Sequence, residues 1–253
     1  MRPAILYVDL LGVRSRWHSG GLEAAQVAFD ALESVLLQAL ELRGTGGIIG
    51  GGIESDAAAL VCEDVIPAIE LGRDLFRGAF LGPTEDGHAR LWLRGAVVPF
   101  ATPGATREEV SLSGRFPGIS KIVYHDSLLE AISVERAGFK GMRLLVSKPL
   151  VTQRVRNHFR MYFGKRWFWP FRKLDYSSYP GRIGEGFWDV LWMASTEQLD
   201  EFNRCMANRL RWSAQDSEEV IQAAATQIVF NEFNAMTGAM VNRARTRGQP
   251  AAS

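Results

Sequence analysis

Residues 4–12 read AILYVDLLG, a short run of strand-forming apolar residues that an aspartate, Asp9, interrupts near its end. Apolar residues in unbroken succession are typical of a strand buried in the middle of a sheet. A carboxylate beside such a strand is unfavourable unless a partner or a metal ion compensates its charge. Asp9 is therefore the first candidate functional residue of the chain.

A glycine-rich segment, GIIGGGIESDAAALV at positions 47–61, predicts two strands joined by a tight turn. The three consecutive glycines at 50–52 are unusual inside a strand and indicate close approach of another backbone or of a ligand. Asp56 follows the turn and begins the second strand. If this hairpin lies beside the first strand, Asp9 and Asp56 face each other at one end of the sheet.

Two carboxylates in that arrangement suit a divalent metal ion. Mg²⁺ typically takes one or two protein carboxylates and completes its shell with water and phosphate oxygens. Two such ions activate an attacking oxygen and stabilise a leaving pyrophosphate. A second interpretation stays open, in which Asp9 caps a strand end and Asp56 is an ordinary turn residue, since aspartate is common in turns.

The remaining periodicity predicts alternating helices and strands up to about residue 150. The expected helices span 22–42, 65–80 and 126–137, and the further expected strands span 89–100, 121–124 and 142–146. This order predicts an α+β, ferredoxin-like core at 1–150 with a mainly antiparallel sheet. Five of the seven tryptophans come later, and we expect 151–253 to form an aromatic-rich, mainly helical extension that packs on the core or on a dimer partner.

Bulk composition excludes several classes of protein. The 29 Lys and Arg residues nearly balance 28 Asp and Glu residues, so nucleic acid and anionic membranes are not expected partners. Two cysteines indicate no disulfide framework. The sequence contains no run of about 18 apolar residues, so we expect no membrane span. Asp9 interrupts the short apolar run at the N-terminus, so we do not expect a signal peptide. We expect a cytoplasmic protein.

The block YVDLLG, the helix after it and the hairpin with SD at its turn resemble the metal-binding core of class III nucleotidyl cyclases. The resemblance covers roughly residues 3–150. It implies a nucleoside triphosphate substrate, and two Mg²⁺ or Mn²⁺ ions held by the carboxylates of Asp9 and Asp56 and the backbone carbonyl of Leu10. It also implies a homodimer with sites at the interface.

The same resemblance implies a role for the loop before the first helix. Amide groups at a helix N-terminus bind phosphate readily, and the groups implied here belong to Leu11, Gly12 and Val13. Chemistry at a triphosphate also needs cations. The candidates are Arg94, Lys148, Arg143, Arg14 and Arg16, each with the alternative of a solvated basic side chain. Tyr124 and His125 lie where the family places base-recognition residues, with the alternative that Tyr124 is an edge-strand aromatic and His125 a surface histidine.

The sequence departs from the purine cyclases at the positions that read the base and stabilise the transition state. Those positions hold Gly52, Leu129 and Ser133. A divergent bacterial branch, which includes the pyrimidine cyclases of the Pycsar antiphage system, is more similar. Its helix pattern resembles Leu128, Ala131 and Glu135, and its aromatic–Asp element resembles GFWDVLW at 186–192. The resemblance implies a cyclase that forms cyclic UMP or cyclic CMP, with UTP preferred, as a second messenger in antiphage defence.

Three other functions stay open at this point. One is an adenylate or guanylate cyclase with replaced specificity residues. Another is a nucleotide-binding regulator without catalysis, because Leu129 and Ser133 replace the expected polar residues. The third is a nucleic-acid-binding protein that uses the basic, aromatic stretch 154–173.

Overall fold

The structure is a computed structural model that describes most of the chain. The described residues are 2–44, 46–54, 56–81, 91–100, 126–136, 139–163, 166–173, 186–193, 198, 200–206, 220–233 and 235. The predicted strand at 121–124, with Tyr124, and His125 lie outside them.

The first strand, β1 (Ala4–Leu10), lies inside a seven-stranded sheet. It pairs antiparallel with β3 on one side and β4 on the other. The sheet order is β2-β3-β1-β4-β5-β9-β8, and among these pairs only β4 and β5 run parallel. The other strands are β2 (Ile48–Glu54), β3 (Ala57–Cys62), β4 (Leu93–Pro99), β5 (Arg143–Ser147), β8 (Phe171–Lys173) and β9 (Phe187–Val190). The prediction of an α+β fold with a mainly antiparallel sheet is confirmed.

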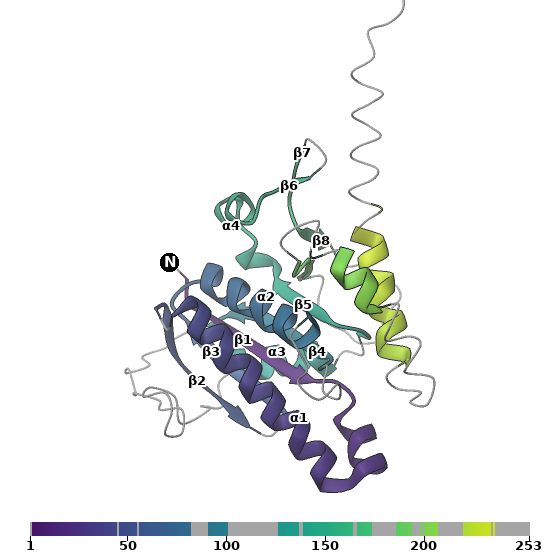
Figure 1. The fold of residues 1–253 in the computed structure, drawn as a ribbon. Coiled ribbons are helices and arrows are strands. Elements are labelled where there is room, and N and C mark those ends of the chain that lie inside the picture. The colour runs from purple at the N-terminus through teal and green to yellow at the C-terminus, as the bar shows by residue number, and fades with distance from the viewer. Residues whose placement is uncertain are drawn as a thin grey trace, which may run out of the picture.

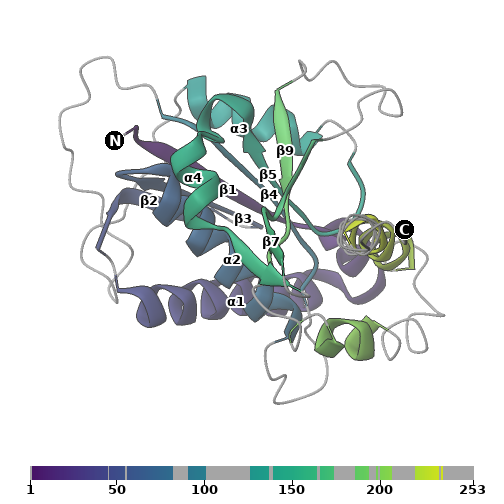
Figure 2. The same ribbon diagram turned by 90° about the horizontal axis from the view of Figure 1, so that it is seen from above.

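Helices cover both faces of this sheet, as Figures 1 and 2 show. The helices α1 (Val13–Arg43) and α2 (Val65–Leu81) lie on one face, and α3 (Asp126–Arg136) packs on β1 and β4 from the other. Successive side chains of β1 point to opposite faces of the sheet. Leu6 and Val8 therefore pack in the core under α1 and α2, and Tyr7 packs in the core under α3. None of the described helices combines the length and apolarity needed to cross a membrane.

The first helix is longer than its apolar pattern predicts. It begins at Val13 rather than near Leu22, and its backbone leaves helical geometry at Gly21, where φ is 68° and ψ is −158°. The buried side chains of α1 begin at Ala25. The segment before Gly21 was missed because it lacks the apolar stripe from which the rest of the helix was predicted.

The glycine-rich strand brings two backbones together, as predicted. Gly51 on β2 has φ 146°, and a Cβ added there would touch the Ala59 carbonyl oxygen and lie 2.7 Å from the Leu60 Cα. Both atoms belong to the backbone of β3, so neither moves aside without disturbing the hairpin. Gly51 therefore allows β2, the strand that leads to Asp56, to lie this close to β3.

We expect Gly51→Ala to lower the free energy of unfolding by about 3 kcal/mol, because it combines backbone strain with overpacking against β3. Urea denaturation followed by circular dichroism measures this change. Gly46→Ala is the matched control, since a Cβ at Gly46 meets nothing within 4 Å. Equal stability of the two variants would contradict the role given to Gly51.

The extension after residue 150 belongs to the same sheet and core. Its described part contains the helix α4 (Gln153–His158), the hairpin β6 (Met161–Phe163) and β7 (Arg166–Phe168), and helical residues 200–206 and 220–233. Helix outweighs strand there, but β9 pairs with β5 and β8 pairs with β9. These short strands were not predicted from the sequence.

Aromatic rings attach the extension to the core. Phe80 of α2 lies 4.8 Å from Phe202, measured between ring centroids, and Trp192 lies 5.1 Å from Phe230. Phe202 and Phe230 stack at 3.7 Å. Aromatic pairs at such distances stabilise a core beyond the area that they bury, so Trp192, one of the tryptophans after residue 150, serves packing here.

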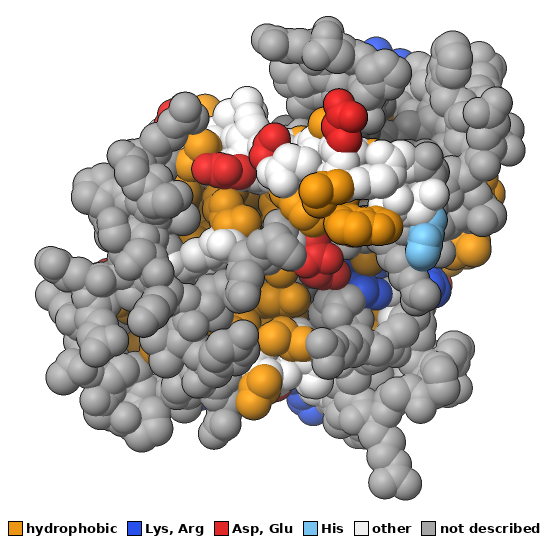
Figure 3. Space-filling view, turned by 90° about the horizontal axis from the view of Figure 1, so that it is seen from below, with side chains coloured by type: hydrophobic (Ala, Val, Ile, Leu, Met, Phe, Trp, Pro, Cys, Tyr) orange, Lys and Arg blue, Asp and Glu red, His pale blue; other side chains and the backbone are white. Residues whose placement is uncertain are grey.

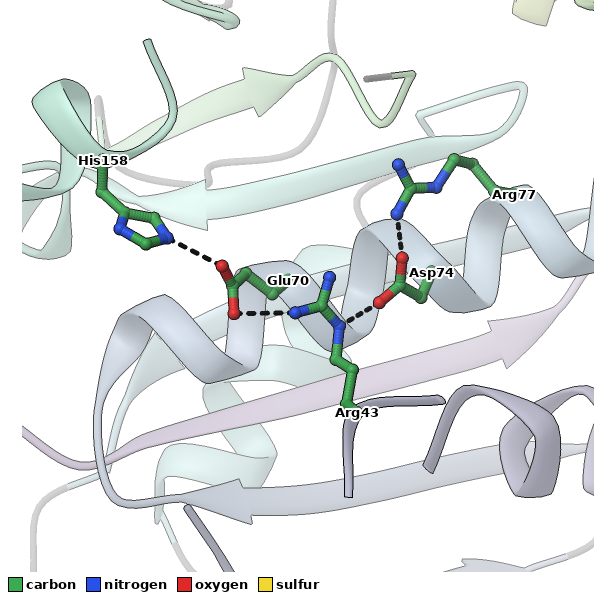
Figure 4. A network of polar contacts seen from close by, with 5 residues as sticks. All are labelled: Arg43, Glu70, Asp74, Arg77 and His158. Atoms are coloured by element: carbon green, nitrogen blue, oxygen red, sulfur yellow. Dashed lines mark hydrogen bonds and ion pairs between the residues drawn. The ribbon is translucent and has the colours of Figure 1, made fainter. Parts of the chain in front are cut away.

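A network of charged side chains joins three helices at the surface (Figure 4). Arg43 at the end of α1 pairs with Glu70 and Asp74 of α2, and Arg77 also pairs with Asp74. Glu70 continues to His158 of α4, whose Nε2 lies 2.7 Å from its carboxylate. Exposed ion pairs each contribute little, but here they connect the extension to the two helices that cover one face of the core sheet.

Candidate active site

A pocket of about 580 Å³ opens at the carboxyl end of β1. Its lining combines acidic, basic and backbone groups. The lining residues are Asp9, Leu10, Leu11, Gly12, Val13, His18, Asp56, Arg94, Lys140 and Gln222. Figure 3 shows a face of the molecule on which acidic and basic side chains lie next to each other among hydrophobic ones.

The structure brings the two predicted carboxylates to this pocket. Asp9 lies between Ala57 of β3 and Arg94 of β4 in the register of the sheet. The Leu10 N–H donates to the Asp56 carbonyl oxygen at 2.8 Å, which holds the β2–β3 turn against the end of β1. Both aspartates are partly buried. Both lie in the pocket because β1 pairs with β3, which puts Asp9 opposite Ala57, the neighbour of Asp56.

The donor set fits a hard divalent cation. Within the described residues, no group of three or more His, Cys, Asp or Glu side chains is arranged to hold a metal ion. Mg²⁺ needs only one or two carboxylates when phosphate oxygens and water supply the rest. Asp9 and Asp56 supply two to the pocket lining, so Mg²⁺ or Mn²⁺ bound together with a phosphorylated ligand matches them better than an ion held by protein alone.

The first turn of α1 forms another part of the wall. Gly12 is the N-cap residue, in the left-handed conformation at φ 81° and ψ 9°, and Gly12 and Val13 both line the pocket. The first amides of a helix have no carbonyl partner within the helix. Leu11 differs from the prediction, because its N–H donates to the Trp92 carbonyl at 2.8 Å. The Leu11 N–H is therefore already engaged within the protein, and phosphate binding by the amides of Gly12 and Val13 stays a prediction.

Among the described residues, Arg94 and Lys140 are the two basic side chains in the pocket lining. Arg94 is partly buried, and its Nη1 donates to the Phe139 carbonyl at 2.7 Å. Lys140, next to Phe139, is exposed and lines the same pocket. Lys140 was not predicted, because a single lysine in the short segment GFKG at 138–141 carries no distinctive pattern.

Lys148 does not lie at this pocket, in contrast to the prediction. The start of β4 meets the end of β1, since the two strands are antiparallel, and β5 runs parallel to β4. Arg143 at the start of β5 therefore lies in register with Arg94, whereas Lys148 follows the far end of the strand. At about 3.3 Å per residue, five residues separate Lys148 from the level of Arg143 by roughly 16 Å.

Arg143 is buried in an ion-pair cluster beside the pocket. Its Nη1 lies 3.0 Å from Asp189 Oδ2, and Arg172 Nη2 lies 3.0 Å from the same oxygen. Arg172 also pairs with Glu232 of the C-terminal helix. Asp189, the acidic residue of GFWDVLW, thus serves packing between β5 and the extension. Arg172 is also one of the basic residues on which the nucleic-acid alternative depends, and its charge is compensated here.

Two further pocket residues were missed from the sequence. His18 lies in the part of α1 before the irregularity at Gly21, and Gln222 lies on the C-terminal helix. The polar segment directly after Gly12 is the one sequence signal that could have pointed to His18. No local pattern marks Gln222, since its approach to the pocket depends on how the extension packs.

Comparison with known proteins gives similarity to two solved nucleotidyl cyclase structures. The adenylyl cyclase CyaB from P. aeruginosa is 13% identical with a TM-score of 0.48, covering 75% of this chain and 93% of that chain. The guanylyl cyclase Cya2 is 14% identical with a TM-score of 0.45, and the match covers 75% of this chain and 91% of that chain. No protein-family model matches the sequence, and no curated protein matches it. At these values the likeness assigns neither a family nor an activity to this chain.

Proposed function

We propose that this protein is a metal-dependent nucleotidyl cyclase, which converts a nucleoside triphosphate into a 3′,5′-cyclic monophosphate and pyrophosphate. The observation that carries the proposal is the pocket in which Asp9 and Asp56 lie with two cations and a helix N-terminus. Carboxylates for metal ions, cations for phosphate charge and amides for phosphate oxygens are the three components that chemistry at a triphosphate requires.

In the proposed reaction the nucleotide 3′-oxygen attacks the α-phosphorus, the bond to pyrophosphate breaks, and the 3′-hydroxyl proton is released. Asp9 and Asp56 would hold two divalent ions, with the Leu10 carbonyl as a further ligand. Bound ions of this kind lower the pKa of the attacking hydroxyl and neutralise the leaving group. Arg94 and Lys140 stabilise the negative charge that develops on the phosphates, and the amides of Gly12 and Val13 orient them.

The preferred substrate under this proposal is a pyrimidine nucleotide, with UTP ahead of CTP. Gly52, at the purine-reading position, lies in β2 opposite Ala59 and presents no side chain. Following the resemblance of the sequence to the Pycsar branch, we propose a cytoplasmic homodimer with sites at the interface and a role in antiphage defence. Sedimentation velocity tests the dimer, and infection assays test the defence.

A nucleotide-binding regulator is the second candidate, because one observation favours it. Leu129 and Ser133 occupy the α3 positions where purine cyclases carry Asn and Arg, and Leu129 is 55% exposed. The Ser133 hydroxyl donates to the Glu130 carbonyl at 2.7 Å within its own helix. Neither residue lines the pocket in the described part of the chain. Adenylate or guanylate cyclisation is the remaining alternative for the substrate.

The test is cyclic product formation from each of the four nucleoside triphosphates, with Mg²⁺ and separately with Mn²⁺, measured by mass spectrometry. We expect cyclic UMP to be the dominant product and to depend on the added metal. A dominant purine product would contradict the pyrimidine assignment. Absence of every cyclic product, together with metal-dependent nucleotide binding, would establish the regulator instead.

A further inference from the structure

The segment 139–142, directly before β5, brings Lys140 to the pocket. This segment lies outside the sheet, since the pairing of β5 with β4 and with β9 begins no earlier than Arg143. The side chains of Phe139 and Met142 are buried, whereas Lys140 is exposed. The position of Lys140 therefore depends on what holds the backbone on either side of it.

The C-terminal helix, residues 220–233, holds this segment through two hydrogen bonds. The Gly141 N–H donates to Gln222 Oε1 at 2.7 Å, and the Met142 N–H donates to Thr226 Oγ1 at 2.8 Å. Gln222 is 3% exposed and Thr226 is fully buried, so the loss of either acceptor leaves a buried amide without this bond. The helix thus supplies acceptors to a segment that strand pairing does not reach.

The helix and the segment meet backbone to backbone at Gly141. The φ of Gly141 is 81°, and a Cβ added there would lie 2.6 Å from the Thr226 nitrogen and 2.8 Å from the Ala225 carbonyl carbon. Both are main-chain atoms of the helix, so a change of side-chain rotamer does not relieve the contact. Because no side chain separates the two backbones here, we expect a shift of the helix to shift the segment that carries Lys140.

Arg94 and Arg143 hold the same segment from the side of the sheet. Arg94 Nη1 donates to the Phe139 carbonyl oxygen at 2.7 Å, and Arg143 Nε donates to the Lys140 carbonyl oxygen at 3.0 Å. Arg94 lines the pocket together with Lys140. The backbone that carries one basic pocket residue is therefore held by the other and by the C-terminal helix.

We propose that Gln222 and Thr226 are positioning residues, which hold Lys140 where it contacts the phosphates of the bound nucleotide. This proposal rests on the function proposed above, in which Lys140 stabilises negative charge on those phosphates. The lysine ammonium is a point charge on a flexible stem, so the place of the backbone limits where that charge can reach. A small displacement of such a group from its productive geometry lowers the rate strongly. The extension is then part of the triphosphate site.

Thr226→Val is the informative variant, because it keeps the shape of the side chain and removes the acceptor for the Met142 N–H. Thr226 does not line the pocket, so the variant leaves the pocket lining itself unchanged. We expect kcat/KM for the preferred nucleotide to fall about fivefold, because the segment with Lys140 loses one of its attachments. Thr226→Ser retains the hydroxyl, and we expect it to keep the kcat/KM of the wild type.

A double-mutant cycle with Lys140→Met shows whether the effect of Thr226 passes through Lys140. We expect Lys140→Met alone to lower kcat/KM about tenfold or more, because it removes a charged contact to phosphate. If Thr226 acts through Lys140, Thr226→Val has no further effect in the Lys140→Met protein. Independent effects would instead multiply to about fiftyfold, and that result would overturn the proposal.

Phe230→Leu is the matched control for stability on the same helix, because Phe230 packs on Trp192 and Phe202. We expect this variant to lower the melting temperature at least as much as Thr226→Val does. At an assay temperature well below the melting temperature, we expect kcat/KM to stay at the wild-type value. An equal fall in kcat/KM would show that the helix acts through stability alone, and this would also overturn the proposal.

Binding of inorganic tripolyphosphate with Mg²⁺, measured by calorimetry on the full chain, separates failure of this inference from failure of the proposed function. One outcome is an affinity that weakens with Thr226→Val only when Lys140 is present, in a protein that forms no cyclic product. This outcome supports the positioning role and refutes cyclisation. Cyclic product with independent effects of the two substitutions refutes the positioning role alone. Absence of both tripolyphosphate binding and cyclic product refutes both.

Discussion

Asp9→Asn is expected to reduce the rate of cyclic nucleotide formation by on the order of a thousandfold, because it removes one of the two carboxylates proposed to hold the metal ions. Asparagine retains the shape of the side chain and one oxygen, so the pairing of β1 with Ala57 and Arg94 is preserved. The change is therefore in charge, not in packing. The measurement is the initial rate at saturating nucleotide and Mn²⁺.

A second measurement separates metal binding from other effects of Asp9→Asn. Paramagnetic resonance of free Mn²⁺ in the presence of nucleotide reports the metal affinity directly, and we expect it to weaken together with the rate. Asp30→Asn is the matched control, because Asp30 lies on the exposed side of α1, where it accepts a hydrogen bond from Gln26 at 2.8 Å. Wild-type rate and metal affinity in Asp9→Asn would remove the basis of the proposed function.

Asp189→Leu is expected to have the largest effect on stability, lowering the free energy of unfolding by about 3 to 5 kcal/mol. Asp189 is 1% exposed and is shared by Arg143 and Arg172, whose side chains are 5% and 16% exposed. Removing the carboxylate leaves two guanidinium groups close together in a largely buried position between β5 and the extension. Urea denaturation measures the change, with the m-value as a check on two-state unfolding.

Two comparisons define what the Asp189 result means. Arg154→Ala breaks the pair with Asp64, but Arg154 is 55% exposed, so we expect at most about 1 kcal/mol. The double variant Arg143→Met/Asp189→Leu removes both members of the buried pair, and we expect it to recover part of the loss, because a buried pair is often replaceable by apolar residues. If Asp189→Leu cost no more than Arg154→Ala, the cluster would have no structural role.

Local sequence patterns were sufficient for the part of the fold that positions the two aspartates. The apolar run before Asp9 and the glycine-rich hairpin before Asp56 determine their own strands, and antiparallel pairing of those strands places both residues at one end of the sheet. The amphipathic helix α2 was predicted to within one residue of its observed end at Leu81. In each case the residues that form the sequence pattern are the residues of the predicted strand, turn or helix itself.

What the sequence did not reveal depends on contacts between distant segments. Lys148 was placed near the site because it follows a core strand, but β5 runs parallel to β4, so the start of β5 at Arg143, and not its end, lies level with Arg94. The strands β6 to β9 have three or four residues each. That is too few residues for the alternation of apolar and polar side chains to be recognised in the sequence. Gln222 reaches the pocket only because its helix packs against Gly141, which no local pattern encodes.

The irregularity at Gly21 divides α1 into two parts that differ in their tolerance of substitution. Residues after it supply the buried stripe of Ala25, Leu32 and Leu36, whereas the described residues between Arg16 and Ala24 include no buried side chain. The part before Gly21 nevertheless contributes Val13 and His18 to the pocket. Val13 also packs against the core, but His18 is exposed, so we expect that substitutions at His18 can change the pocket lining at little cost in folding stability.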